Sequence, residues 1–564
     1  MSAEWPATPA VMPGDSRATL PGGHLLVRAL RRHGVDTVFG VPGESFLSAL
    51  DGMFELRGQI RFVSCRQEGG AAFMAEAWGK LTGRPGVCMV TRGPGATNAA
   101  IGLHTAFQDS TPLLLFIGQV GREFLDREAF QEIDYRRMFG PVTKWVAQID
   151  LAARIDEYVD RAVHVACSGR PGPVVLALPE DMLSELALPL EMPPMRPSAR
   201  CAPAPGDLAA AAAMLATASR PLVLLGGSGW TAADLQRLQR FANHWQLPVG
   251  TSFRRQDLID NRHQCYAGDV GIGIAPYLAE DVRKADLLLV LGARVDEMTT
   301  SGYALLESPR SRQRLLHMAA SADLLNTTHQ ADLAIQATPA EMAAALEQLQ
   351  PPSQIPWAAR TAYLHAQWKA HVAPDQPIDG LHLGRFFAHL RRVLPDDAIV
   401  TNGAGNYAAW LHRHFEYRGY PTQLAPQSGA MGYGVPAAVA AALAHPERIV
   451  VSVSGDGCFM MNGQELATAA QHGLRILFIV VNNSRYGTIR MHQEREFPGR
   501  VMGTDLVNPN FVALGSAYGL HAERVTRNEG VEKALRRCLD CAGSSLLEVV
   551  PDSHWLSPRA RVAA

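Results

Sequence analysis

The chain lacks any run of about 18 apolar residues, which is the length that a membrane-spanning helix needs. Its first 17 residues contain no apolar core and little positive charge, so we expect a short disordered tail there rather than a signal peptide. The sequence also lacks an excess of either charge, since 52 Lys and Arg face 54 Asp and Glu for a net charge of −2. We therefore expect neither a nucleic acid nor a membrane as partner.

Cysteine is scarce and has neither the spacing of a zinc site nor that of a disulfide framework. The eight cysteines are scattered, and only Cys538 and Cys541 form a CxxC pair, with no second pair to complete a site. We expect two reduced thiols on a helix surface there, and a protein that works in the reducing cytoplasm.

Apolar residues are abundant and make up 47% of the chain, which suits a large buried core. The length of 564 residues is enough for several domains. Two Pro-rich stretches, 189–205 and 349–356, have the composition of linkers. They leave three segments, 20–187, 206–348 and 372–552. Each segment alternates apolar strands with helical stretches, which predicts three doubly wound α/β domains with parallel sheets.

The most informative stretch begins with a β-branched run at 449–453, the pattern of a buried parallel strand. A helix is predicted over 462–472 and a second buried strand over 476–481. This βαβ unit should have a right-handed crossover, which places Asp456 and Asn483 past the carboxyl ends of neighbouring strands. Open α/β sheets bind ligands at that edge.

The residue types at this edge suit a divalent cation and a phosphate. Asp456 offers a carboxylate oxygen and Asn483 an amide oxygen, and Mg²⁺ takes oxygen ligands that it usually shares with a phosphate-bearing molecule. Gly455 and Gly457 would let the backbone approach a diphosphate closely. Ordinary turns also use these residue types, so turn formation alone is the alternative.

The pattern GDG followed by NN resembles the diphosphate-binding motif of thiamine diphosphate (ThDP) enzymes. The resemblance implies that Asp456, Asn483 and the backbone carbonyl of Arg485 hold Mg²⁺ against the cofactor diphosphate. It extends over about 20–552 and is best to the acetolactate synthase-like group. That group has a pyrimidine-binding domain first, a central domain next and a diphosphate-binding domain last.

Glu68 is the leading catalytic candidate. It stands where a predicted strand passes into a helix, and capping of that helix would be its ordinary role. The segments RQEGGAAFMAEAWGKLTG and TRGPGATNA resemble the ThDP-enzyme pattern in which such a Glu bonds the aminopyrimidine ring and assists loss of the C2 proton. A buried carboxyl group that keeps its proton can share it with a ring nitrogen. Gly93 and Gly95 would contact the cofactor from the GPG loop.

Four further residues are placed by the resemblance. Asn406, in a Gly-rich loop after a predicted strand, would line the diphosphate, and Met431 in SGAMGYGVPAA would prop the cofactor in a bent shape. Core filling is the alternative for Met431. Gln131, after Phe130, and Lys144 resemble an active-site segment of acetolactate synthases, with a solvated surface helix as the alternative.

The central segment leaves the question of a flavin open. After a predicted buried strand it carries the pattern GAR-x-D, and in acetolactate synthases the matching segment lies at an FAD. Gly268, Gly273 and Arg294 are the residues that the resemblance would place there. Relatives without flavin share this fold, so FAD stays an open cofactor beside ThDP and Mg²⁺.

Two positions depart from the acetolactate synthase pattern. His492 stands where those enzymes carry a Trp that shapes the acceptor pocket, and Glu44 stands where a second Gly is common. Both residues would make the pocket polar if they face it; otherwise both are solvated at its entrance.

The resemblance implies decarboxylation of a 2-keto acid such as pyruvate, followed by carboligation to a second carbonyl compound. The active enzyme would be a homodimer or homotetramer, with Glu68 of one subunit and Asp456 of another completing each site. A decarboxylase that does not ligate, and a non-catalytic binding or regulatory homologue, are the alternatives.

Overall fold

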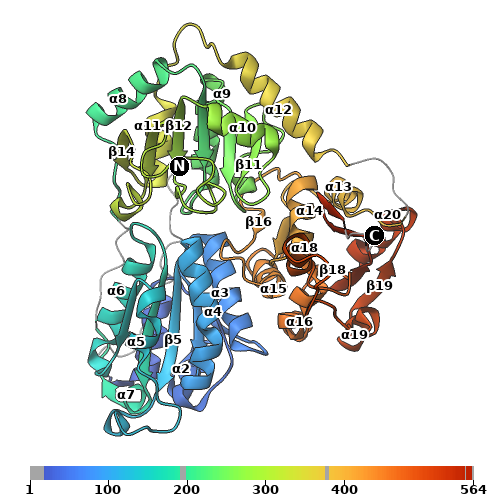
Figure 1. Ribbon diagram of the computed structural model, residues 1–564. Coiled ribbons are helices and arrows are strands. Elements are labelled where there is room, and N and C mark those ends of the chain that lie inside the picture. Colours follow the sequence, from blue (N-terminus) through green and yellow to red (C-terminus); the bar gives the residue numbers. More distant parts are fainter. Residues whose placement is uncertain (1–17, 191–198, 375–379, 553, 562–564) are drawn as a thin grey trace. The chain divides into compact units, whose positions relative to one another are not determined.

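The computed structural model describes residues 18–190, 199–374, 380–552 and 554–561 (Figure 1). Its contacts divide the chain into two compact units. The first unit comprises 1–199, 439–444 and 462–472; the second comprises 200–438, 445–461 and 473–564. The first unit contains one six-stranded parallel sheet and the second contains two, each flanked by helices. The predicted fold class, three doubly wound α/β domains, is confirmed.

The sheet of the first unit is built from short buried strands. Their order across the sheet is β3 (Arg61–Ser64), β2 (Thr37–Gly40), β4 (Gly86–Val90), β5 (Leu113–Gln119), β7 (Pro173–Pro179) and β6 (Trp145–Gln148). Its main helices are α1 (Gly22–Arg32), α2 (Leu47–Glu55), α3 (Glu68–Thr82), α4 (Gly93–Asp109) and α6 (Ile155–Cys167). Every residue of β5 is buried, as expected for a central parallel strand.

The second unit begins with the central sheet. Its order is β11 (Tyr266–Val270), β10 (Val249–Ser252), β9 (Pro221–Leu225), β12 (Leu287–Leu291), β13 (Arg314–Ala319) and β14 (Leu333–Gln336). Its helices are α8 (Pro205–Ala216), α9 (Ala232–His244), α10 (Pro276–Lys284), α11 (Pro339–Glu347) and α12 (Ala358–Val372). Trp245 and Trp357 are fully buried in its core.

The third sheet carries the GDG and NN motifs. Its order is β16 (Gln423–Leu424), β15 (Ile399–Asn402), β17 (Val450–Gly455), β18 (Ile476–Val481), β20 (Ser545–Val549) and β19 (His521–Val525). Its helices include α13 (Leu383–Val393), α14 (Asn406–His414), α15 (Gly434–Ala444), α18 (Gly487–Glu496), α19 (Phe511–Ala517) and α20 (Asn528–Asp540). The chain goes from β15 to β16 on one side and then returns to β17 on the other side of β15, so a topological switch point lies between β15 and β17.

The helix predicted over 462–472 begins earlier than expected. α16 spans Asp456–Asn462, a 3-10 turn (Gly463–Glu465) follows, and α17 spans Leu466–Gln471. The sequence pattern missed the first segment because Gly455 and Gly457, on either side of Asp456, suggest a loop. Helical geometry is supported there by Asp456, whose Oδ1 accepts a hydrogen bond from the N–H of Gly457 at 3.0 Å.

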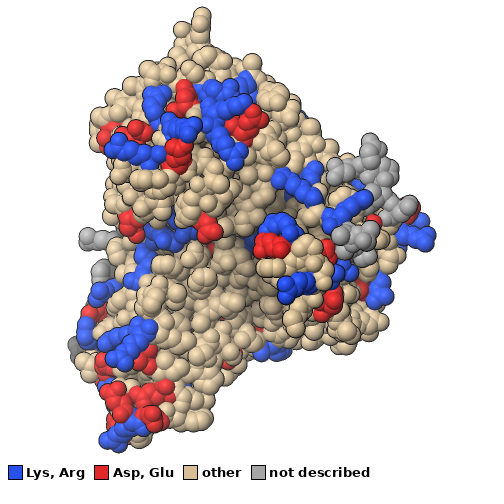
Figure 2. Space-filling view, viewed as in Figure 1, with Lys and Arg blue, Asp and Glu red and all other residues tan. Residues whose placement is uncertain are grey.

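No helix in the described ranges has both the length and the hydropathy needed to cross a bilayer. On the face shown in Figure 2, basic and acidic side chains are interspersed over both units, and no broad surface of one sign is visible. That face offers nothing like the continuous basic surface that nucleic-acid binding requires.

A buried carboxylate joins the central sheet to the third sheet within the second unit. Oδ2 of Asp257 accepts the N–H groups of Thr422 at 3.0 Å and Gln423 at 3.1 Å, at the start of edge strand β16. Nearby, Oδ1 of Asn261 accepts the N–H of Tyr417 at 2.8 Å. Because these amides are buried, they depend on the two side chains for acceptors.

We predict that Asp257→Ala lowers the free energy of unfolding by about 2 kcal/mol, since it leaves two buried amides without an acceptor. Thermal and denaturant unfolding would measure the loss. The matched control is Asp260→Ala in the same loop, which removes a surface ion pair to Arg262 and should cost less than about 1 kcal/mol. Equal losses in both variants would contradict a special role for Asp257.

Candidate active site

A cavity of about 240 Å³ opens at the switch point of the third sheet, past the carboxyl ends of β15 and β17. Loops after these strands and after β18 form its walls, together with the start of α18. It brings together most of the diphosphate-site residues predicted from the sequence. Its lining includes Ala404, Gly405, Asn406, Met431, Gly455, Asp456, Gly457, Asn483, Arg485 and Tyr486.

Asp456 is the buried charge of this cavity, with only 3% of its surface exposed. Its Oδ2 accepts a hydrogen bond from Nδ2 of Asn508 at 2.7 Å. Burial raises the pKa of Asp456, while hydrogen bonds from Asn508 and from the backbone amides of Gly457, Ser484 and Arg485 oppose that shift. Within the described ranges, no Lys, Arg or His forms an ion pair with this carboxylate, so it is a fitting ligand for a cation.

The two adjacent asparagines have different tasks. Asn482 is held by other side chains, because its Nδ2 donates to buried Glu548 at 2.7 Å and its Oδ1 accepts from Asn508 at 3.0 Å. Asn483 lines the cavity, and its Oδ1 accepts the N–H of Arg485 at 3.3 Å. The second asparagine is therefore the one that faces the cavity, and its role as a metal ligand stays a prediction.

These residues fit Mg²⁺ and a diphosphate. The available donors are a carboxylate, an amide oxygen and the Arg485 carbonyl, all of them the hard oxygens that Mg²⁺ prefers. Gly457 and Tyr486 pack tightly in the cavity wall. A Cβ added at Gly457 would lie 2.4 Å from the ring of Tyr486, so the backbone there has no room for a side chain. Asn508 and Glu548 support the site, although no motif in the sequence pointed to either.

Glu68 lies in the first unit, at the first turn of α3. The helix is capped by Gln67, whose side chain accepts the N–H of Gly70, so Glu68 is not needed as the capping group. Its Oε2 accepts a hydrogen bond from Nδ2 of Asn98 at 2.9 Å. A Cβ added at Gly95 would stand 3.6 Å from Glu68 Oε1, which shows how closely the GPG segment approaches the carboxylate.

The GPG segment is the first turn of α4 rather than a loop. Its Gly93 N–H donates to the carbonyl of Gln131 at 3.0 Å, so Gln131 lies beside this turn. Just before it, the buried guanidinium of Arg92 donates to Glu180 at 2.8 Å and lies 3.6 Å from Glu44 Oε1. Arg92 and Glu180 were not anticipated from the sequence, and they make this edge of the first unit polar.

The structure does not bring Lys144 to this edge. Its Nζ donates to the carbonyls of Ser168, at 2.6 Å, and Val165, at the end of α6. Lys144 precedes the first residue of β6, and in a parallel sheet the strand starts lie opposite the edge that carries Glu68. The sequence pattern misled here because a run of charged residues does not reveal which edge of the sheet it reaches.

The structure also places His492 away from the cavity. Its Nδ1 is 2.8 Å from the guanidinium of Arg495, one turn along α18, and His492 does not belong to the cavity lining. Thr488 and Ile489 line the cavity instead. Counting residues after the NN motif placed His492 correctly on α18, but it did not show which face of α18 lines the cavity.

The central sheet has little room at its own switch point, between β9 and β12. The indole of Trp230 is buried there and donates to the carbonyl of Gly226 at 2.8 Å, and a Cβ at Gly292 would meet its ring at 2.9 Å. Of the residues that resemble a flavin site, Gly268 lies in β11 and Arg294 follows β12, with β10 and β9 between those strands. The FAD site that the resemblance attaches to Gly268, Gly273 and Arg294 stays a prediction.

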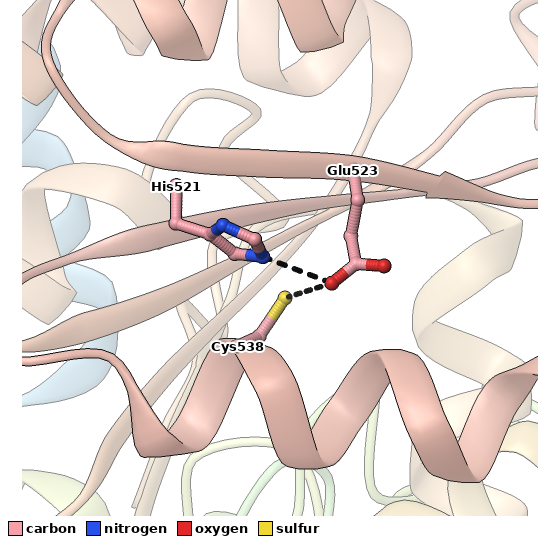
Figure 3. Close-up of side chains that lie close together, drawn as sticks. All are labelled: His521, Glu523 and Cys538. Carbon is pink, nitrogen blue, oxygen red and sulfur yellow. Dashed lines mark hydrogen bonds and ion pairs between the residues drawn. The ribbon is translucent and has the colours of Figure 1, made fainter.

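A second group of side chains, His521, Glu523 and Cys538, lies at the far edge of the third sheet (Figure 3). Glu523 Oε1 is 2.9 Å from His521 Nε2 and 3.7 Å from Cys538 Sγ. Cys538 was expected on a helix surface, but it lies on the buried face of α20 because that face packs against the sheet.

This group satisfies its own hydrogen bonds and charge. The guanidinium of Arg537 pairs with both carboxylate oxygens of Glu523. Burial raises the pKa of the Cys538 thiol to about 12, so a metal would have to displace both a cation and a proton. We assign no metal to it. None of the eight cysteines forms a disulfide.

Comparison with known proteins identifies the family of the chain. Three family models of thiamine pyrophosphate (TPP, another name for ThDP) enzymes match the chain. They are the N-terminal TPP binding domain over 20–138, the central domain over 208–349 and the C-terminal TPP binding domain over 403–549. The two TPP binding models cover Glu68 and Asp456, respectively.

Several curated relatives match along almost the whole chain. The acetolactate synthase isozyme 2 large subunit of Escherichia coli (strain K12) is 33% identical over 542 residues, which cover 94% of this chain and 95% of that protein. The acetolactate synthase large subunit of Parasynechococcus marenigrum (strain WH8102) is 32% identical, covering 94% and 87%. The mitochondrial acetolactate synthase catalytic subunit of Saccharomyces cerevisiae is 28% identical, covering 97% and 84%. The chain therefore belongs to the family of thiamine pyrophosphate enzymes that includes the acetolactate synthase large subunits.

Proposed function

We propose that the protein binds ThDP with Mg²⁺, decarboxylates a 2-keto acid such as pyruvate and transfers the remaining two-carbon unit to a second carbonyl compound. The observation that supports this best is the set of oxygen donors around buried Asp456 at the switch-point cavity. When bound, ThDP would supply a thiazolium ring as the sink for the electron pair that stays on the keto acid's carbonyl carbon when the bond to the carboxylate breaks and CO₂ leaves.

The chain's own residues bind and orient in this proposal. Asp456, Asn483 and the Arg485 carbonyl hold Mg²⁺ and thereby neutralise the diphosphate. Glu68 holds a proton at a nitrogen of the aminopyrimidine ring, and Asn98 orients the Glu68 carboxyl group. Met431 lines the same cavity as Asp456, where it can support the cofactor from its apolar side.

We further propose a homodimer or homotetramer in the cytoplasm. Glu68 and Asp456 belong to different compact units of the chain. A site that takes Glu68 from one subunit and Asp456 from another would make activity depend on assembly.

Similarity to acetolactate synthases does not identify the acceptor substrate, so the acceptor is inferred from the residues at the edge of the first unit. The carboxylates of Glu44 and Glu180 share one guanidinium, that of Arg92, at the edge beside Gly93. Polar groups that an acceptor leaves unpaired weaken its binding, so this edge disfavours a purely aliphatic acceptor. Release of the decarboxylated product without ligation is the second candidate; a non-catalytic role fits poorly with the retained Asp456, Asn483 and Glu68.

The metal assignment predicts that Asp456→Ala greatly weakens ThDP binding, because the diphosphate charge is no longer neutralised through Mg²⁺. Calorimetry with ThDP at saturating Mg²⁺ measures this. Asp505→Ala is the matched control, since Asp505 is exposed and pairs only with Arg490 near the same turn. Wild-type affinity in Asp456→Ala would overturn the assignment.

The role of Glu68 predicts that Glu68→Gln folds and binds ThDP but exchanges the C2 proton of the bound cofactor about 10²–10⁴ times more slowly. Quenched deuterium exchange followed by NMR measures that rate. Glu157→Gln removes an exposed carboxylate that pairs with Arg154 on α6, and should leave the rate unchanged. An unaltered rate in Glu68→Gln would refute the role.

The acceptor proposal predicts little preference between pyruvate and 2-ketobutyrate in direct competition. One methylene is worth about 10–200-fold in an apolar pocket, whereas the edge at Glu44, Arg92 and Glu180 is charged. Glu44→Gly should raise the share of the 2-ketobutyrate product, whereas His492→Trp should not, because His492 faces Arg495. A strong preference in the wild type, or a shift with His492→Trp alone, would contradict this pocket assignment; acetaldehyde as the main product would favour the decarboxylase.

A further inference from the structure

The turn that presents Glu68 is held by a second, fully buried glutamate. Glu465 belongs to the same compact unit as Glu68, through the segment 462–472. Its Oε1 accepts the backbone N–H groups of Arg66 at 3.0 Å and Gln67 at 3.1 Å. Its Oε2 accepts the hydroxyl of Thr468 at 2.5 Å. These amides belong to the two residues immediately before Glu68.

The contacts make Glu465 an acceptor for buried donors. All three partners are donors, which suits an ionised carboxylate. Burial raises the pKa of Glu465, and the hydrogen bonds from Thr468, Arg66 and Gln67 oppose that shift. Placing a carboxylate in an apolar interior is costly unless it is well hydrogen-bonded, so a fully buried Glu with these particular partners indicates a specific task.

The turn has no alternative acceptor of its own at this point. β3 ends at Ser64 and α3 begins at Glu68, so the N–H groups of Arg66 and Gln67 belong to neither ladder. Gln67 is the helix cap, and its side chain is already used to accept the N–H of Gly70. Glu465 therefore fixes the backbone of the cap residue, and with it the direction in which Glu68 leaves the helix.

We propose that Glu465 is a positioning residue for Glu68: its carboxylate sets the geometry of the turn 66–67, and thus the placement of the Glu68 carboxyl group at the cofactor ring. This inference rests on the proposed function. Glu465 itself contacts neither cofactor nor substrate in this role.

Substitution of Gly70 offers a second way to disturb the contact between Glu465 and the N–H groups of Arg66 and Gln67. A Cβ added there would lie 2.8 Å from Glu465 Oε1, and its three nearest atoms all belong to the Glu465 side chain. Gly within a helix is less favourable than Ala by about 0.5–1 kcal/mol, so Gly70→Ala should not weaken α3 itself. It should instead displace the Glu465 carboxylate from the two amides.

The first test needs no cofactor. Hydrogen–deuterium exchange of the apoprotein should show the amides of Arg66 and Gln67 protected in the wild type and exchanging at least about tenfold faster in Glu465→Ala. Gly70→Ala should fall between them, and Glu465→Gln, which keeps an oxygen acceptor, should restore most of the protection. Gln471→Ala is the control, because Gln471 accepts a hydrogen bond from the side chain of Arg66 and not from its backbone N–H, which donates to Glu465. Unchanged protection in Glu465→Ala would overturn the proposal.

The second test follows the cofactor. Glu465→Ala and Gly70→Ala should slow C2 proton exchange by about tenfold to a hundredfold, as expected for a misplaced catalytic group, with ThDP affinity and the KM for pyruvate nearly unchanged. In the Glu465→Ala background, Gly70→Ala should add nothing, since both act through one contact. Additive effects would overturn the inference, and Gly70→Ala alone keeps it testable if Glu465→Ala does not fold. A wild-type protein that fails to bind ThDP would instead refute the proposed function.

Discussion

The buried carboxylate of Asp456 is the constraint on which the third sheet depends. The carboxyl ends of β15 and β17 meet at a switch point, and the chain places a carboxylate there with amide donors but, among the described residues, no ion-paired Lys, Arg or His. An ionised group in such a place needs a counter-charge from outside the chain. The surrounding residues suit a cation that brings a phosphate, because Asn508 holds Asp456 while Asn482, tied to Glu548, leaves Asn483 to face the cavity.

The parts of this site that could be predicted from the sequence are those with local causes. A buried strand that ends in a glycine-flanked Asp456, and a second strand that ends before Asn483, are both short-range patterns, and parallel pairing of β17 with β18 brings them to one edge. The three α/β domains follow from the same alternation of strands and helices. Glu68 needed more than a pattern, because a carboxylate at a helix start is ordinary, and only the resemblance distinguished it.

The parts that escaped prediction depend on contacts between distant segments. Glu180 reaches Arg92 across 88 positions and Glu465 reaches Arg66 across 399, and no local periodicity records such pairs. The misplacements have a related cause. Lys144 and His492 were located correctly along the chain, but the edge of a sheet and the face of a helix are decided by packing.

Glutamate appears in three different physical settings around the first unit's site, and the settings explain the different tasks. Glu465 is fully buried among donors, which makes it an acceptor that orders backbone. Glu68 is half-buried and accepts a hydrogen bond from Asn98, and the proposed function assigns it the proton at the cofactor ring. Glu44 is exposed and shares Arg92 with Glu180, which leaves its charge to act on whatever approaches the edge. Because desolvation strengthens every charge interaction, the proposed tasks of ordering backbone, transferring a proton and selecting an acceptor would follow the decreasing burial of the same functional group.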